Sequence, residues 1–428
     1  MVGNVSRRGV LAGASIMGVM TTLPALAKPG PGGFSPEGLK AVTAAMQAAI
    51  DKGDAAGVVT LLYRHGEVAQ VNAVGFQDEA AKTPMRRDTI FRIASMTKPI
   101  VSVATLILIE EGKLGLTMPV EKFLPELANP KLLSDPADAL DTGKPSPRGI
   151  TVLDLLTHRS GIATPGTAPG PLVEALKNAY AAREIGPDEW IKRVGALPLA
   201  YEPGTRFNYG NSFDVLGVLI ARASGMSLPD FLEARIFKPF AMKDTGFFVP
   251  ADKIARLATN YNVDPQTRKR VVADQPGPSS RWAKPPAFPS GAGGLVSTAD
   301  DYLSFAKMLL GKGRNGNVRL LSHESVTLMT SDQLTPEQRK TPFSGFDFWA
   351  GQGFGLGVSV VDDVARQARS PFGYSSAGSF GWPGAFGTWW QADPKEDMVQ
   401  IFLIQLPAAD PRTPVRAFQE TSYRAIDD

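Results

Sequence analysis

Residues 91–98 read Phe-Arg-Ile-Ala-Ser-Met-Thr-Lys and lead into an apolar run that ends at Gly112. This pattern predicts a helix that begins near Ser95, and side chains three residues apart on a helix lie on one face. Ser95 and Lys98 are therefore expected to touch. A serine hydroxyl needs a nearby base to act as a nucleophile, and the first N–H groups of a helix lack partners inside it. The stretch predicts a serine nucleophile with a lysine base, placed where a helix start stabilises an oxyanion.

The spacing of this pair is not sufficient evidence by itself, because Ser304 and Lys307 have the same spacing. The second pair falls inside an amphipathic helix expected over residues 302–310. Thr298 and Asp301 are expected to start that helix as a capping box. A serine in the middle of a helix is not presented at a helix start, so we interpret Ser304 as ordinary helix surface.

Two later stretches offer partners for Ser95 and Lys98. The Tyr209 phenol could shuttle a proton, and the Asn211 amide could hold the lysine or a substrate carbonyl. Residues 380–387 alternate glycine with aromatic residues and open a strand candidate, where a backbone N–H could complete an oxyanion hole. Each stretch has a purely structural alternative when read alone, which is a turn for the first and a bulged, tightly packed edge strand for the second.

The remaining pattern predicts an α+β fold, with an antiparallel sheet flanked by helices and an inserted all-helical domain. Two β-rich runs around a glycine turn indicate a hairpin, and strand candidates return near the end of the chain. We expect an α/β domain from residues 28–94 and 288–428, and a mainly helical domain over 95–287. The strands are expected at 58–63, 68–74, 355–361, 377–391 and 398–406. Further helices are expected at 36–52, 151–157, 187–194, 212–224 and 228–237, and an extended loop at 263–294.

Composition excludes several classes of function. The 428 residues are 43% hydrophobic and 20% charged, which is typical of a globular chain and not of a disordered one. The absence of cysteine excludes disulfides, thiolate catalysis and iron–sulfur clusters. The three histidines are far apart, so neither a metal site nor any cofactor is expected. The net charge of +3 comes without a long basic run, and we expect no nucleic-acid partner.

Residues 1–27 have the pattern of an export signal. Arg7 and Arg8 precede an apolar run over 9–23, and Ala25-Leu26-Ala27 is a small-residue cleavage site. The segment resembles a twin-arginine signal, and its alternatives are a Sec signal or an uncleaved anchor. We expect a periplasmic or secreted protein with no permanent membrane span after processing.

Three motifs together resemble those of a known superfamily. Ser95-x-x-Lys98, Tyr209-x-Asn211 and Trp382-x-Gly384 resemble the set of the serine β-lactamase and penicillin-binding superfamily. The chain is most similar to the class C β-lactamase-like branch and, within it, to the family VIII carboxylesterases. The stretches 155–161, 202–206 and 293–300 also resemble that branch, and the resemblance spans residues 36–406.

The resemblance implies an acyl-transfer mechanism with assigned roles. Ser95 would attack the acyl carbon, and Lys98 with Tyr209 would act as a coupled base, after which Tyr209 would protonate the leaving alcohol. The backbone N–H groups of Ser95 and Ala385 would form the oxyanion hole. Asn211, Trp382 and Gly384 would line the substrate site.

The third motif departs from the superfamily's usual K-T-G. Trp382 stands at the lysine position, and a neutral indole removes a cation that would select an anionic substrate while it adds apolar area. This favours a small-molecule ester, neutral and with a short acyl or aromatic group, over penicillins. Weak β-lactam hydrolysis stays open, as do a D-amino-acid peptidase, an acyltransferase and a non-catalytic penicillin-binding-like sensor. The chain has no G-x-S-x-G, which argues against an α/β-hydrolase.

Among the histidines, His158 is expected to be a packed, hydrogen-bonded side chain and not a base.

Overall fold

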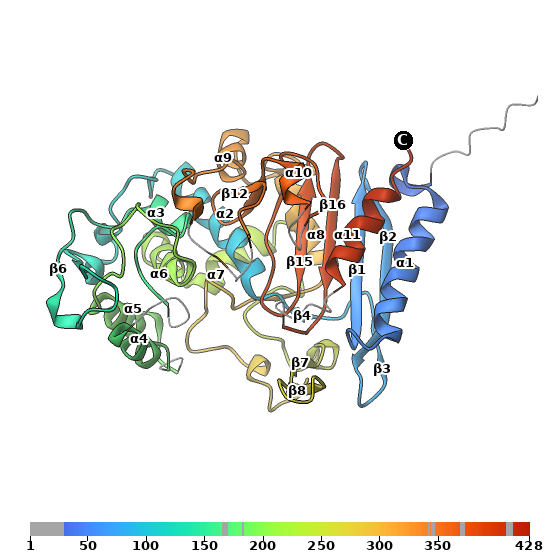
Figure 1. The fold of residues 1–428 in the computed structure, drawn as a ribbon, viewed down its shortest axis with the longest axis horizontal. Coiled ribbons are helices and arrows are strands. Elements are labelled where there is room, and N and C mark those ends of the chain that lie inside the picture. The colour runs from blue at the N-terminus through green and yellow to red at the C-terminus, as the bar shows by residue number, and fades with distance from the viewer. Residues whose placement is uncertain are drawn as a thin grey trace, which may run out of the picture.

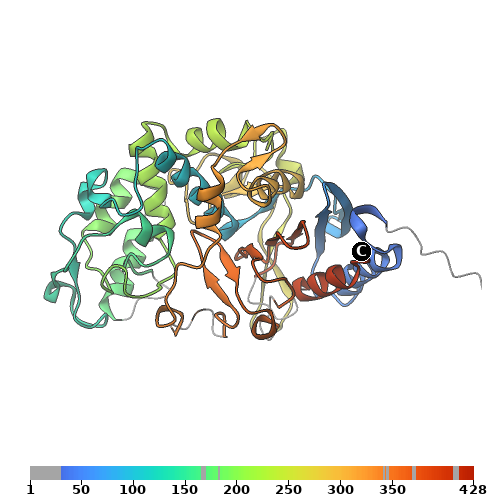
Figure 2. The ribbon, with the colours of Figure 1, turned by 90° about the horizontal axis from the view of Figure 1, so that it is seen from above.

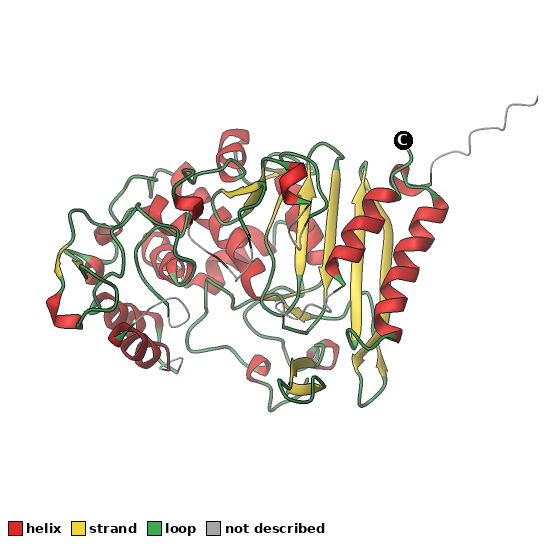
Figure 3. Cartoon of the chain, viewed as in Figure 1, coloured by secondary structure: helices red, strands yellow, loops and turns green. Residues whose placement is uncertain are grey.

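The structure is a computed structural model that describes residues 30–164, 170–181, 184–340, 343, 347–368, 373–407 and 414–428. The expected export signal lies outside these residues and stays a prediction. An eight-stranded sheet occupies one part of the molecule, and helices α3 to α6 occupy the opposite end (Figures 1 and 2). The predicted fold class, an antiparallel sheet flanked by helices, is confirmed (Figure 3).

The sheet is built from both ends of the chain. The first long strand and the last strand pair at its centre, where Val59 lies opposite Leu403. In sheet order the strands are β12 (Gln352–Phe354), β13 (Ser359–Val361), β14 (Phe380–Gly381), β15 (Trp389–Asp393), β16 (Met398–Leu403), β1 (Gly57–Arg64), β2 (Glu67–Asp78) and β3 (Thr83–Pro84). Among the described residues, four two-stranded pairs lie outside it: β4 (Phe91–Arg92) with β9 (Val296–Ser297), β5 (Lys131–Leu132) with β6 (Lys144–Pro145), β7 (Asn260–Val263) with β8 (Arg270–Asp274), and β10 (Arg314–Asn315) with β11 (Val318–Arg319).

Helices cover both faces of this sheet. Helices α1 and α11 pack on one face and α8 on the other. The α-helices of the described residues are α1 (Pro36–Asp51), α2 (Thr97–Glu110), α3 (Val152–Leu156), α4 (Pro171–Ala181), α5 (Pro187–Gly195), α6 (Ser212–Ser224), α7 (Leu228–Leu232), α8 (Ala299–Leu310), α9 (His323–Met329), α10 (Val364–Gln367) and α11 (Val415–Arg424). Because side chains alternate along a strand, Val58 and Leu62 of β1 pack in the core of α1 and α11, while Val59 and Leu61 pack in the core of α8. This explains why every residue of β1 is buried.

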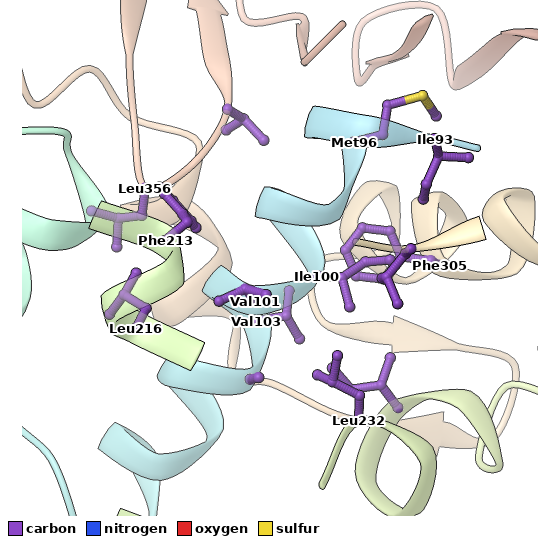
Figure 4. Close-up of a cluster of buried hydrophobic side chains, with 14 of the residues drawn as sticks. Ile93, Met96, Ile100, Val101, Val103, Phe213, Leu216, Leu232, Phe305 and Leu356 are labelled. Carbon is purple, nitrogen blue, oxygen red and sulfur yellow. The ribbon is translucent and has the colours of Figure 1, made fainter. Parts of the chain in front are cut away.

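Helix α2 lies at the centre of the larger core and carries the predicted nucleophile region. All residues from Thr97 to Leu108 are buried, as expected for a helix that is apolar on most of its surface. Ile100 and Val103 of α2 pack among Phe213 of α6 and Phe305 of α8 (Figure 4). The predicted helix is therefore confirmed, although it begins at Thr97 after a 3₁₀ turn over Ala94–Met96.

Several expectations about local structure need correction. The strand expected over 355–361 begins only at Ser359, because residues 355–358 form the turn between β12 and β13, in which the Gly355 amide donates to the Val358 carbonyl. The stretch expected to be a loop over 263–294 contains strand β8, because the Asp264 carboxylate accepts hydrogen bonds from the Gln266 and Thr267 amides and closes a hairpin turn. The strand expected over 377–391 is split into β14 and β15, because residues 384–387 form a turn in which the Gly387 amide bonds the Gly384 carbonyl.

The expected capping box at α8 is only half formed. The Thr298 side chain accepts a hydrogen bond from the Asp301 amide, as predicted. The Asp301 carboxylate, however, accepts from the Asp244 amide at 2.7 Å and from the Thr245 hydroxyl at 2.9 Å. It therefore joins α8 to residues 244–245, in the segment between α7 and β7, and does not return to its own N-cap.

Asp301 gives a testable effect on stability. It is 8% exposed, and burial raises its pKa from 3.8 to about 6 against the lowering effect of its hydrogen bonds. The folded chain thus binds more protons than the unfolded chain between these values, so stability falls as pH rises through this window. We expect Asp301→Asn, whose amide oxygen can still accept both hydrogen bonds, to raise the free energy of unfolding by about 1–3 kcal/mol at neutral pH. Urea unfolding of the wild-type protein and of the variant measures this difference in the free energy of unfolding.

The pH dependence provides the control for Asp301→Asn. The gain should shrink as the pH falls from about 7 toward 4, because the wild-type carboxyl becomes neutral there. The exposed Asp264→Asn variant should show no such gain, since the hydrogen bonds of the turn lower the pKa of Asp264. A gain for Asp301→Asn that is equal at all pH values would contradict this explanation.

Within the described part of the chain, no single helix has the length and apolar composition of a membrane span. Only α6 together with the bent segment Leu228–Phe237, at 77° to it, meets that test by length and composition.

Candidate active site

Ser95 reaches the surface from an otherwise buried stretch. Of the residues from Thr89 to Leu108, it is the only one that is not buried. Ala94 before it has a φ of +44°, which is uncommon for a residue with a side chain and is typical of functional turns. The 3₁₀ turn and this backbone conformation place the Ser95 hydroxyl just before the first turn of α2.

The Ser95 hydroxyl lies between the two predicted base residues. Lys98 donates from Nζ to Ser95 Oγ at 2.9 Å, and the Tyr209 hydroxyl lies 2.7 Å from the same oxygen. Lys98 is 2% exposed, also donates to the Ala292 carbonyl at 2.7 Å, and lies 4.5 Å from the centre of the Tyr209 ring. The structure therefore brings together three side chains from distant parts of the chain in the arrangement that a serine nucleophile needs.

His158 and its neighbours hold the loop that carries Tyr209 in place. The His158 ring lies 4.5 Å from the Tyr209 ring, and its Nδ1 accepts from the Gly210 amide at 3.3 Å. The His158 carbonyl accepts from the Asn208 amide at 2.7 Å. His158 is fully buried with a φ of +54°, and burial, together with the nearby Lys98 charge, holds its pKa well below 6.5. It is a neutral, packed histidine, as expected.

Asn211 lies next to this group but makes a different contact from those proposed for it. Its side chain is buried and donates from Nδ2 to the Ala163 carbonyl at 3.4 Å. Among the described residues, no hydrogen bond joins it to Lys98. The contact fastens the start of α6 to residues 158–163, and a role toward substrate stays a prediction.

Trp382 contacts the site through the Tyr209 hydroxyl. Its indole is 1% exposed and donates from Nε1 to the Tyr209 hydroxyl oxygen at 3.1 Å. Phe348 and Phe354 pack against its ring, with centroids 5.5 and 5.0 Å away. The apolar area expected to face a substrate is already covered by protein, and the indole N–H is the group that joins Trp382 to Tyr209.

Gly384 fits a position that a side chain could not occupy. A Cβ there would lie 2.4 Å from the carbonyl oxygen of Ile93, two residues before Ser95. Thr388 also donates from its hydroxyl to this carbonyl, at 3.2 Å. Close backbone contact is the reason for glycine here, and it fastens the third motif to the strand that leads to Ser95.

Ala385, predicted to complete the oxyanion hole, lies in the exposed turn after Gly384 and not in a strand. Within the described residues, neither its amide nor the amide of Ser95 has a hydrogen-bond acceptor. These two amides belong to segments that touch where Gly384 packs against the Ile93 carbonyl, and both are available to donate to a substrate oxygen. This is compatible with an oxyanion hole. That role stays a prediction.

An aromatic wall surrounds the Tyr209 and Trp382 rings. Only Tyr209 and Phe343 are partly exposed in this cluster, and their ring centroids lie 4.9 Å apart. The buried members are Phe207, Leu334, Phe348, Trp349, Phe354 and Trp382. The surface beside the Ser95 hydroxyl is therefore aromatic. The part of the chain that the structure describes holds no cluster of three potential metal ligands.

Comparisons with known proteins give matches over most of the chain. Residues 42–423 match a family model described as Beta-lactamase. Protein Rv1367c of Mycobacterium tuberculosis is 45% identical over 362 residues, which cover 85% of this chain and 88% of that protein. Esterase EstB of Burkholderia gladioli is 32% identical over 79% of this chain and 82% of its own length. The solved structure of EstCE1, described as a hydrolase with promiscuous acyltransferase activity, is 26% identical, with a TM-score of 0.75 over 92% of this chain and 99% of that chain.

Proposed function

This chain belongs to the Beta-lactamase family, in the esterase-like branch of the serine β-lactamase and penicillin-binding superfamily, and from that premise we propose that it is a serine carboxylesterase. The observation that carries the proposal is the Ser95 hydroxyl held between the Lys98 amine and the Tyr209 hydroxyl. Such a hydroxyl can lose its proton as it attacks a carbonyl carbon. The similarity to Esterase EstB supports an ester as the bond that is cleaved.

The proposed reaction has two balanced halves. Tyr209 acts as a phenolate whose own proton is held by the Lys98 amine. Ser95 Oγ forms a bond to the acyl carbon as its proton passes to this phenolate oxygen, and the carbonyl oxygen becomes an oxyanion at the Ser95 and Ala385 amides. The ester C–O bond then breaks, and Tyr209 returns the proton to the leaving alcohol. Water attacks the acyl-enzyme in the same way, which releases the carboxylic acid and restores the Ser95 hydroxyl.

The substrate class follows from charge and ring chemistry at the site. Position 382 holds a neutral indole and no cation, and the partly exposed ring of Phe343 lies beside Tyr209. A substrate carboxylate would find no second cation at the third motif, while an aromatic or short apolar group would pack against the exposed rings. We therefore propose neutral short-chain or aromatic esters over penicillins.

Hydrolysis of p-nitrophenyl acetate and butyrate beside nitrocefin tests this substrate class. We expect turnover of both esters and little turnover of nitrocefin, which carries a carboxylate. Nitrocefin turnover that rivals the esters would contradict the role given to the neutral indole and would favour a β-lactamase.

Acyl transfer to an alcohol is a second candidate, because EstCE1 is described with both activities. The same acyl-enzyme serves either reaction, and the acceptor decides between them. A primary alcohol added to the ester assay separates them, since a transferase yields a new ester in place of the free acid. Ester or penicillin that acylates Ser95 without release would instead identify a sensor.

A further inference from the structure

The hydrogen bond between Trp382 and Tyr209 places the third motif in direct contact with the base. Trp382 Nε1 lies 3.1 Å from the Tyr209 hydroxyl oxygen, and that oxygen lies 2.7 Å from Ser95 Oγ. The indole cannot easily turn away, because it is 1% exposed and held by Phe348 and Phe354. Its N–H therefore points at the atom that exchanges a proton with Ser95.

An indole N–H can only donate, so the Tyr209 oxygen must be the acceptor. In the neutral phenol this oxygen accepts from Trp382 and donates to Ser95. In the phenolate form, the Tyr209 oxygen accepts hydrogen bonds from both the Trp382 N–H and the Ser95 hydroxyl. The Trp382 bond is therefore the same in both forms, and only the bond with Ser95 changes direction. Hydrogen bonds to charged groups are stronger than those between neutral groups, and the Trp382 N–H therefore favours the phenolate.

We infer that Trp382 is a positioning residue for the proposed esterase reaction, whose indole N–H holds the Tyr209 oxygen in place and stabilises it as the acceptor of the Ser95 proton. This role rests on the proposed function. It differs from the role in substrate binding that the sequence alone suggests, because the indole acts through Tyr209.

The other charged and titratable groups at Tyr209 fit this role. Lys98 Nζ lies 4.5 Å from the centre of the Tyr209 ring and donates to the Ser95 hydroxyl oxygen and to the Ala292 carbonyl. His158 contacts the opposite side of the loop and stays neutral, because burial and Lys98 hold its pKa well below 6.5. The basic side chain that contacts both Ser95 and the Tyr209 ring is therefore Lys98 and not His158.

Trp382→Phe tests the inference because it keeps an aromatic ring and removes the N–H. We expect kcat/KM for p-nitrophenyl acetate to fall about ten- to a hundredfold, mainly in kcat, and the rising limb of its pH profile to move to higher pH by about one unit. The matched control is Trp282→Phe, because Trp282 is also buried but its Nε1 has no hydrogen-bond partner among the described residues. That variant should keep the wild-type profile.

Site-specific benzothienylalanine at position 382 preserves the shape of the indole without its N–H, so it answers the question even when Trp382→Phe folds poorly. An unmoved pH limb in this variant, with or without a loss of activity, would overturn the positioning role. The proposed function is tested separately, because it fails only when the wild-type protein shows no ester turnover that depends on Ser95.

Discussion

Replacing Ser95 by alanine is expected to lower kcat for p-nitrophenyl acetate by about 10⁴-fold or more, since the variant has no atom to form the acyl-enzyme. Fold stability should change little, because the Ser95 hydroxyl bonds only Lys98 and Tyr209 in the described structure. Steady-state turnover, combined with fluorophosphonate labelling and mass spectrometry of the labelled peptide, measures both the loss and the site.

The chain contains its own matched control for Ser95→Ala. Ser304 has a lysine at the same spacing but lies within α8, and no contact joins its hydroxyl to Lys307 in the described structure. Ser304→Ala should keep wild-type turnover and labelling. Full turnover in Ser95→Ala, or loss of turnover in Ser304→Ala, would show that the nucleophile is assigned to the wrong residue.

Removing the Tyr209 hydroxyl is the second large effect. Tyr209→Phe is expected to lower kcat by about 10²–10⁴-fold, because the Ser95 proton and the leaving alcohol lose the group that exchanges a proton with them. KM should change less, since the ring still packs against His158 and Phe343 at 4.5 and 4.9 Å. Separate kcat and KM values, with the thermal midpoint as a check on folding, measure this prediction.

Tyr201→Phe is the control for Tyr209→Phe, because the Tyr201 ring lies under the Arg206 guanidinium at 4.5 Å and, among the described residues, its hydroxyl forms no hydrogen bond with Ser95 or Lys98. It should retain wild-type kinetics. If Tyr209→Phe kept its kcat, Lys98 alone would be the base, and the proposed path of the proton would be wrong.

Local patterns predicted those parts of the site that depend on neighbours in the chain. Helical spacing alone indicated that Ser95 and Lys98 touch, and the 2.9 Å contact confirms it. Tyr209 was placed beside them only through the resemblance of three motifs in order. Helix and strand propensities act between neighbours in the chain and cannot bring Tyr209 to Ser95. Tertiary packing decides which loops meet.

The features that the sequence did not predict all depend on distant partners. The Asp301 carboxylate turns to Asp244 and Thr245, which compete with its own N-cap. His158 supports the Tyr209 loop through a left-handed backbone conformation. Histidine adopts this conformation more often than most residues do, but only contacts with distant segments fix it at this position. The Trp382 indole is buried because Phe348 and Phe354 cover it, and alternation along a strand cannot predict that.

The pairing of Val59 with Leu403 at the centre of the sheet also has a consequence for synthesis of the chain. During translation, the apolar strand β1 emerges long before β16, and until then one edge of the β1–β2 hairpin has no neighbour. Contacts so distant in sequence slow folding, and an unpaired apolar edge invites association with other chains. The sheet therefore cannot be completed until β16 has been synthesised. A molecular chaperone that covers β1 until then would increase the yield of folded protein.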